Sequence, residues 1–270
     1  MWHLTRTCIT ARYEKETCVP ETNETLHNRF IELSGLPERG RVVDLGCGAG
    51  PALAAFARRF PQAHLTGLDR SEQALDTARE RLQHRSGIVE LASVDLREKL
   101  PLAEASVDAV ISSNLLECLP DPAQLLKEIW RVLWPGGRAV LSHSDFDAIV
   151  ISGVPVDLDR RVGHAFADDA PPWMDSSDGR IGRKLPGLVH ASPLVRTHVE
   201  TVVTSSTELT GHAARRVGDI RGALRSTARR GHGTVGLDEI DKWYDAVQQA
   251  ADAGDFFFAE TAVVVAAHAV

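Results

Sequence analysis

The segment RVVDLGCGAG, residues 41–50, combines the residue types that hold a nucleoside-like ligand. An apolar run ends at Leu45, and three glycines then alternate with small residues: Gly46, Gly48 and Gly50. Glycine lets a ligand approach the main chain, and a helix that begins at Pro51 would point its free N–H groups at that ligand. With Asp44 two residues before the first glycine, the pattern predicts a strand, a tight turn and a helix N-terminus at a cofactor site.

The next apolar runs also end in polar side chains. Asp69 ends the run 64–69, and it follows Asp44 by 25 positions. Two further runs behave alike: residues 88–94 lead to Asp95, and residues 107–114 end at Asn114. Because ligands of open parallel sheets bind beyond the carboxyl ends of the strands, these side chains are expected to converge on one crevice, with Asp69 on the ribose hydroxyls of a nucleoside.

A helix and a fifth strand follow the fourth apolar run. In DPAQLLKEIWRVLWPGG, Asp121 can cap a helix and Pro122 suits its first position, while the PGG at its end stops it. A strand is predicted at 138–143. This order of motifs resembles the class I S-adenosylmethionine (SAM) dependent methyltransferase superfamily, small-molecule type, over about residues 38–145.

The resemblance implies an α/β fold, a Rossmann-like seven-stranded, mostly parallel sheet with helices on both faces, and S-adenosyl-L-methionine as cofactor, with S-adenosyl-L-homocysteine as product. It also implies that the sequence positions matching the superfamily's motifs contact the cofactor. Gly46 and Gly48 would face its methionine part, Asp69 the ribose, Arg70 the adenosine, Asp95 and Leu96 the adenine, and Asn114 the sulfonium side, with Asp44 and Gly50 completing the motif.

The chain is expected to form a single domain, 1–270, in four parts. These are an N-terminal helical cap (1–37), a SAM-binding core (38–145), a lid insertion after strand five (146–195) and C-terminal strands and helices (196–270). The cap contains Tyr13 and folds over the cofactor or packs on the sheet edge; both alternatives stay open.

Methyl transfer is an in-line displacement, so the protein must align a nucleophile and exclude water, and a base is optional. His143 and Asp145, at the end of the fifth strand, are the candidate catalytic residues. The candidate acceptor-binding residues are Tyr13, Glu117, Asp147, His164 and Trp173. His143, Asp145 and Asp147 could also hold a metal, but hydrogen bonds to the backbone are the preferred interpretation, and no metal is expected.

The carboxylates around this pocket favour N-methylation of an amine-bearing metabolite. O-methylation of a hydroxylated metabolite is the alternative, and a non-catalytic SAM-binding scaffold or sensor is the alternative from another class. The G-x-G-x-G spacing does not match the dinucleotide motif of dehydrogenases.

The composition suits a cytoplasmic enzyme acting on a small-molecule acceptor, as a monomer or homodimer. A formal net charge of -7 argues against nucleic-acid binding. Six arginines between Arg215 and Arg230 are expected to form a solvated helix face. The four cysteines lack C-x-x-C spacing, and no apolar stretch is long enough for a membrane span.

Overall fold

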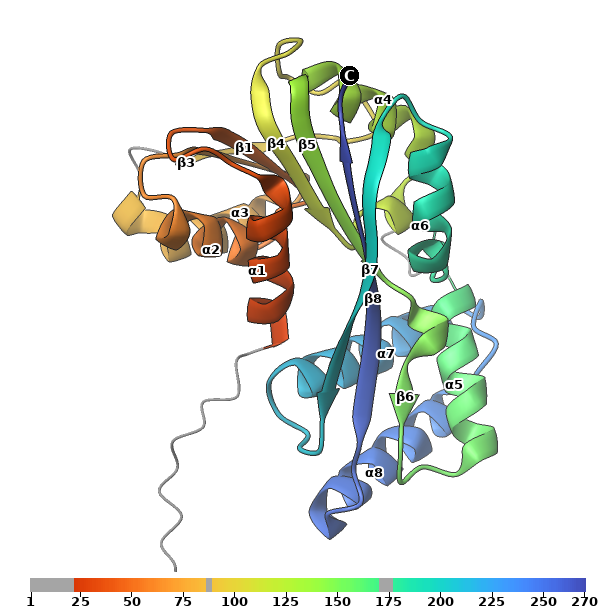
Figure 1. Cartoon of the computed structure of the whole chain (residues 1–270). Coiled ribbons are helices and arrows are strands. Elements are labelled where there is room, and N and C mark those ends of the chain that lie inside the picture. Colours follow the sequence, from red (N-terminus) through yellow and green to blue (C-terminus); the bar gives the residue numbers. More distant parts are fainter. Residues whose placement is uncertain (1–21, 86–88, 170–176) are drawn as a thin grey trace, which may run out of the picture.

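The computed structural model describes residues 22–85, 89–169 and 177–270, and its centre is one mostly parallel β-sheet (Figure 1). The main strands are β1 (Arg41–Leu45), β2 (His64–Asp69), β3 (Val89–Ser93), β4 (Val107–Ser113), β5 (Leu133–Ser144), β7 (Val195–Ser206) and β8 (Phe258–His268). The order is β3-β2-β1-β4-β5-β8, with β7 on the outer edge of β8.

The first five of these strands run parallel, and β8 is antiparallel to both β5 and β7. The Rossmann-like sheet and its antiparallel edge are confirmed. The predicted count of seven strands omits β6 (Val150–Ile151), a two-residue strand that also pairs with β8.

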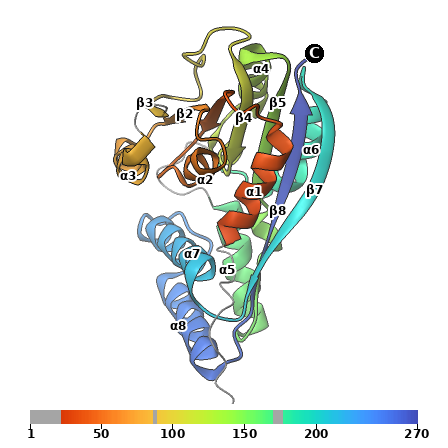
Figure 2. The same cartoon turned by 60° about the vertical axis from the view of Figure 1, so that its left-hand side comes forward.

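Helices cover both faces of the sheet (Figure 2). On one face lie α1 (Thr22–Ser34), α2 (Pro51–Arg59) and α3 (Glu72–Leu82), and on the other lie α4 (Pro122–Val132) and α6 (Ile181–His190). Local sequence fixes the starts of two of them. The side chain of Ser71 caps α3 by accepting the Ala74 N–H, and Asp121 caps α4 directly before Pro122.

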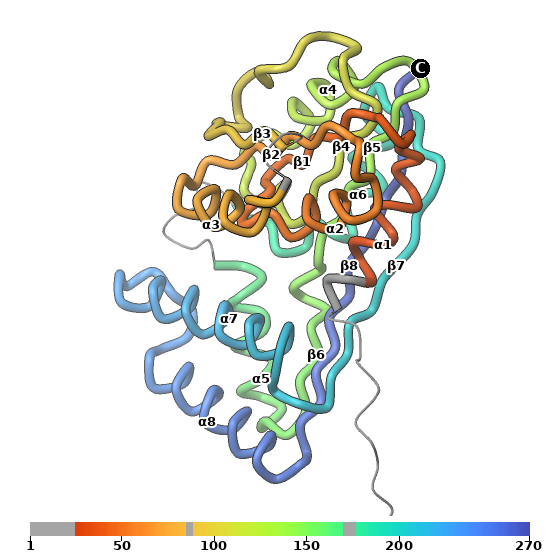
Figure 3. Tube along the Cα trace, turned by 90° about the vertical axis from the view of Figure 1, so that its left-hand side faces the viewer, coloured from red at the N-terminus to blue at the C-terminus, as the bar shows by residue number. Residues whose placement is uncertain are grey.

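Three helices form a separate layer, here called the lid layer, beyond the carboxyl ends of the first strands (Figures 1 and 3). They are α5 (Val156–Asp168), α7 (Gly211–Arg229) and α8 (Leu237–Ala253). Long strands β7 and β8 extend into this layer, which has its own apolar core around Val162, Leu224 and Trp243. Trp243 is therefore a core residue, as its helical spacing predicts.

The segment 146–195, predicted as a lid insertion, contributes helices to two layers. Its first helix, α5, joins the lid layer, whereas α6 packs on the sheet with Leu185 and Val189 beside Leu141 of β5. Two glycines and Pro186 within α6 disfavour a helix. Its apolar residues nonetheless follow helical spacing, and burial on the sheet outweighs the low helix propensity.

Among the described residues, no helix has the length and apolar character needed to cross a membrane.

Candidate functional site

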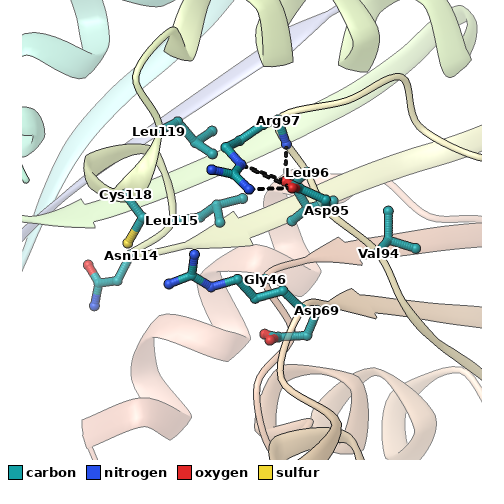
Figure 4. A pocket seen from close by; sticks show the side chains of 11 residues that line it. Gly46, Asp69, Val94, Asp95, Leu96, Arg97, Asn114, Leu115, Cys118 and Leu119 are labelled. Carbon is teal, nitrogen blue, oxygen red and sulfur yellow. Dashed lines mark hydrogen bonds and ion pairs between the residues drawn. The ribbon is translucent and has the colours of Figure 1, made fainter. Parts of the chain in front are cut away.

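A pocket opens where β1, β2, β3 and β4 end. It is lined by Gly46, Asp69, Arg70, Val94, Asp95, Leu96, Arg97, Asn114, Leu115, Cys118 and Leu119 (Figure 4). Six of the predicted cofactor residues are therefore brought together. Asp44, Gly48 and Gly50 are not among the lining residues.

The three glycines of the turn have different surroundings, although all have positive φ angles. A Cβ atom on Gly46 would lie 3.1 Å from a methyl group of Leu115, and one on Gly50 would lie 3.1 Å from Ala78 of α3. A Cβ on Gly48 would meet nothing within 4 Å. Gly48 therefore faces open space at the turn, while Gly50 allows α2 and α3 to pack closely.

Asp69 is fixed at the tip of β2 by backbone donors. Its Oδ2 accepts the Gly48 N–H at 2.8 Å and its Oδ1 accepts the Ser71 N–H at 2.9 Å. Each carboxylate oxygen has a second lone pair, so the side chain can still accept the two hydroxyl groups of a ribose. Asp44 is buried beneath it, where loss of solvation and the charge of Asp69 raise the pKa of Asp44 to about 8.

At the other end of the pocket, Asp95 is held by Arg97. The Arg97 backbone N–H and guanidinium both donate to the Asp95 carboxylate, the Nε to Oδ1 bond being 2.9 Å long (Figure 4). These bonds lower the pKa of Asp95 to about 2. Leu96, between them, is buried. The sequence analysis missed Arg97, although its position two residues after Asp95 allows this contact.

Asn114 links the pocket to β5. It has a φ angle of 51°, and its side-chain oxygen accepts the Ser144 N–H at 2.8 Å. Its own N–H donates to the carbonyl of Ser142 at 3.1 Å. His143 lies between these two serines, so the end of the cofactor pocket is connected directly to the candidate catalytic residue.

His143 and Glu117 form a buried polar pair next to this end of the pocket. Glu117 lies on the short helix η2 (Leu116–Cys118), and His143 is 0% exposed. Nδ1 of His143 is 2.7 Å from the Ser144 carbonyl, which can only accept, so Nδ1 carries the proton and Nε2 is an acceptor. Nε2 lies 3.5 Å from Oε2 of Glu117, and within the described part of the chain neither atom has a hydrogen-bond partner.

Burial sets the charge state of this pair. It raises the pKa of Glu117 to about 8 and lowers the pKa of His143 to about 4. Both side chains are therefore neutral at pH 7. A buried carboxyl and imidazole that lack partners cost stability, and such groups are concentrated at functional sites.

The carboxylates that follow β5 are bound by arginines near the start of α6. Nη2 of Arg183 donates to Asp145 at 2.8 Å, and Nε of Arg180 donates to Asp147 at 3.1 Å. His164 lies 3.8 Å from Asp147. Among the described residues, no group of three histidine, cysteine, aspartate or glutamate side chains could hold a metal ion.

One arginine of α7 is not on a solvated face, which corrects that expectation. The Arg216 side chain is 11% exposed and forms an ion pair with Glu260 of β8 at 2.8 Å. Arg221 and Arg225 also have a partner, Asp241 of α8. The sequence analysis missed Glu260 because no local spacing relates it to a residue 44 positions away.

The N-terminal cap packs on the sheet in its described part. Phe30 of α1 is fully buried, and Nε of Arg29 donates to Glu200 of β7 at 2.7 Å. Tyr13 and Trp173 lie outside the described residues.

Comparison with known proteins identifies the cofactor-binding part. Residues 43–141 match the family model described as "Methyltransferase domain". The chain is 31% identical over 230 residues to an uncharacterized 37.1 kDa protein in transposon TN4556 of Streptomyces fradiae, covering 84% of this chain and 62% of that protein. It is 38% identical over 135 residues to trans-aconitate 2-methyltransferase of Variovorax paradoxus, covering 50% of this chain and 48% of the relative. The matches thus span about half to three fifths of these relatives.

The fold is also that of a solved methyltransferase. Geranyl diphosphate C-methyltransferase from Streptomyces coelicolor, crystallised with S-adenosyl-L-homocysteine, superimposes with a TM-score of 0.54 at 16% identity, over 91% of this chain and 76% of the other. The pocket, the glycine turn and the family match agree: residues 43–141, which supply every residue that lines the pocket, form a methyltransferase domain.

Proposed function

We propose that the protein transfers the methyl group of S-adenosylmethionine to a hydroxyl group of an uncharged small molecule. One observation carries the proposal: Nε2 of His143 and Oε2 of Glu117 are buried, close to the end of the cofactor pocket, and without partners among the described residues. The hydroxyl group of a methyl acceptor could satisfy both atoms. Its hydrogen would be donated to Nε2 of His143, and its oxygen would accept the proton of the Glu117 carboxyl in a hydrogen bond.

The pocket residues fit the cofactor. The pocket lies at the carboxyl ends of the strands, Gly48 faces open space, and Asp69 has lone pairs left for a ribose. Asp44, Gly46, Gly48, Gly50, Asp69, Arg70, Asp95, Leu96 and Asn114 are the residues we assign to cofactor binding. When bound, SAM supplies an electrophilic methyl group.

The residues beside the acceptor orient it and take up its proton. Neutral His143 accepts the hydroxyl proton at Nε2 while the methyl group is transferred, and its Nδ1–H remains bonded to the Ser144 carbonyl. The protonated Glu117 carboxyl can donate to the acceptor oxygen before transfer. Burial of the pair keeps water away from the reacting atoms.

The charges favour an uncharged acceptor over a cationic amine. Asp145 and Asp147, which would hold a cation at the end of β5, already bind Arg183 and Arg180. Ring contacts join His143 to Phe146, and Phe146 to Phe166, so aromatic rings lie between the pair and the lid layer. An alcohol or phenol reaches such a site without losing charge, whereas an ammonium group must first be deprotonated.

A methylated amine is the second candidate, and carboxylate-bearing acceptors are a third chemistry, since one relative is named for trans-aconitate. With a carboxylate-bearing acceptor, Arg183 would contact the acceptor, and Asp145 would act only by holding Arg183 in place. Asp147 and His164 line a second cavity beside α5, and both remain candidates for acceptor binding.

The test is to incubate the protein with SAM labelled with ¹³C at the methyl group and a pool of small metabolites. We expect a labelled product, and its methyl carbon shift in NMR should show attachment to oxygen. Attachment to nitrogen would support the amine candidate instead. If the protein binds SAM but labels no compound, the scaffold or sensor alternative gains support.

Variants of the pair test its role once a product is known. His143→Gln and Glu117→Gln should each lower kcat by roughly 10²-fold to 10⁴-fold, the usual contribution of a general acid or base. SAM affinity should stay unchanged. The matched control is His190→Gln, at an exposed histidine that ends α6.

A further inference from the structure

The ion pair between Arg216 and Glu260 is buried at the contact between the lid layer and the sheet. Nη2 of Arg216 donates to Oε1 of Glu260 at 2.8 Å, and Nε lies 3.1 Å from both carboxylate oxygens. The side chains are 11% and 3% exposed. His212, also on α7, is a second partner of Glu260, with its Nε2 2.5 Å from Oε2. Removing the arginine takes the permanent positive charge away from a buried carboxylate, which acts on neighbouring groups.

Phe146 connects this ion pair to His143. The Arg216 guanidinium lies 4.8 Å from the centre of the Phe146 ring, and the His143 ring centre lies 5.7 Å from the same point. On the other side, the Ser144 hydroxyl donates to Glu260, and the Ser144 carbonyl accepts from His143. His143 and the ion pair are therefore separated by one aromatic ring and one serine.

Titratable groups from four parts of the fold surround His143. They are Glu117 on η2, whose carboxyl is neutral at pH 7, and three charged groups: Asp178 just before α6, Arg216 on α7 and Glu260 on β8. Burial has the largest effect on the imidazole and disfavours its protonation. The positive charge of Arg216 acts in the same direction, whereas the negative charges of Asp178 and Glu260 favour protonation.

We propose that Arg216 is a positioning residue carried by the lid layer, which, together with His212, holds the carboxylate of Glu260 and offsets its negative charge beside the imidazole of His143. Because Arg216 lies on α7 and Glu260 on β8, the contact between these two elements sets the charge next to the base. The proposal rests on the proposed function of His143 as the base. Its test does not depend on identifying the acceptor.

The experiment follows the protonation of His143 by NMR in the full-length protein saturated with S-adenosylhomocysteine. Histidines are labelled with ¹³C at Cε1, and the His143 signal is the one lost in His143→Gln. The titration midpoint of His143 is compared among four proteins: the unaltered chain, Arg216→Met, Glu260→Gln and the double variant.

We expect opposite shifts from the two single variants. In Arg216→Met, Glu260 keeps only its contacts with His212 and Ser144 and loses its arginine, so the His143 midpoint should rise, by about one pH unit. In Glu260→Gln, His143 should stay neutral down to the lowest pH at which the protein is folded. The double variant should return the midpoint close to that of the unaltered chain, a pattern that a purely structural role would not give.

Two matched variants are the controls. Arg225→Met and Asp241→Asn break ion pairs between α7 and α8 that do not involve Glu260, and they should leave the His143 midpoint unchanged. If Arg216→Met does not fold, Arg216→Lys, which keeps the charge, should preserve the midpoint, while Glu260→Gln should still lower it.

Unchanged midpoints, or single variants that shift His143 in the same direction, would overturn this inference. Such a result would not touch methyl transfer, which is measured separately with labelled SAM. Conversely, the protein could transfer no methyl group while the two single variants still shift the His143 midpoint in opposite directions. The inference about the ion pair would then hold, and the proposed function would not.

Discussion

Single side chains at this site have protonation states that their burial imposes. Asp44 and Glu117 both have a pKa raised to about 8, and His143 has a pKa lowered to about 4. The sequence indicated Glu117 and His143 as candidates, because they stand at the ends of two neighbouring strands. It could not indicate that both are neutral, since burial depends on Phe146, α6 and the lid layer packed around them.

The raised pKa of Glu117 predicts a pH dependence of stability. A group that binds its proton more tightly when folded destabilises the fold as pH rises from its ordinary pKa, 4.5, to its folded pKa, about 8. Glu117→Gln has no carboxyl to ionise, so the variant does not lose stability in this way. The difference in free energy of unfolding, variant minus unaltered protein, should therefore increase as the pH rises from 4.5 to about 8. The increase should be about 1.4 kcal/mol for each unit of pKa difference.

Urea unfolding between pH 5 and pH 8 measures this difference. His143 has the opposite slope, with stability rising from pH 4 to pH 6.5, but it is present in both proteins and largely cancels. Stability curves that stay parallel across the range would show that Glu117 is not protonated in the folded protein.

Asp69 should bind the ribose. Asp69→Ala removes a charged acceptor for the hydroxyl groups, and it also frees the Gly48 N–H of the glycine turn. We expect the affinity for S-adenosylhomocysteine to fall by about 1.5–3 kcal/mol, measured by calorimetry. Asp76→Ala, at an exposed residue of α3, is the control and should bind normally. Equal affinities of the two variants would remove Asp69 from the ribose contact.

At the scale of secondary structure, apolar runs with polar ends predicted the sheet closely. The runs 41–45 and 64–69 coincide with β1 and β2, because a strand buried on both faces has a nearly continuous apolar sequence. Helix α6 was missed because its glycines and Pro186 disfavour a helix, and its stability comes from contacts with β5 that the sequence does not show.

The close packing of α6 on β5 depends on Gly182. A Cβ atom there would lie 2.8 Å from the His143 carbonyl oxygen. Gly182→Ala should therefore destabilise the protein by about 1–3 kcal/mol, as overpacking does, in urea unfolding. Gly187→Ala is the control on the same helix, since its Cβ would meet nothing within 4 Å, and it should be neutral or stabilising. Equal effects of the two substitutions would contradict this packing.

At the scale of the whole molecule, two layers with separate apolar cores meet at His143 and Phe146. Which helices form the lid layer could not be read from the sequence, because 42 residues separate the end of α5 from the start of α7 and the two helices meet only in the folded protein. The ion pair that joins the layers is equally long-range. Local patterns therefore predicted the cofactor half well and the acceptor side poorly.

The lid layer should open as a unit. Leu224→Ala creates a cavity in its core and should cost about 2–5 kcal/mol. Hydrogen exchange should become faster in α5, α7 and α8 together, and change little in α2 and α3. Leu126→Ala, in the core between α4 and the sheet, is the matched control and should affect the sheet. Faster exchange confined to α7 would argue against a cooperative layer.

The central claim is that the cofactor presents its methyl group to Glu117 and His143. A crystal structure with SAM bound measures this directly, as the distance from the methyl carbon to Nε2 of His143. We predict ribose hydroxyls on Asp69 and a methyl carbon within about 6 Å of Nε2, which leaves room for one acceptor atom in line. A methyl group directed toward α1, with the pair out of reach, would contradict the account.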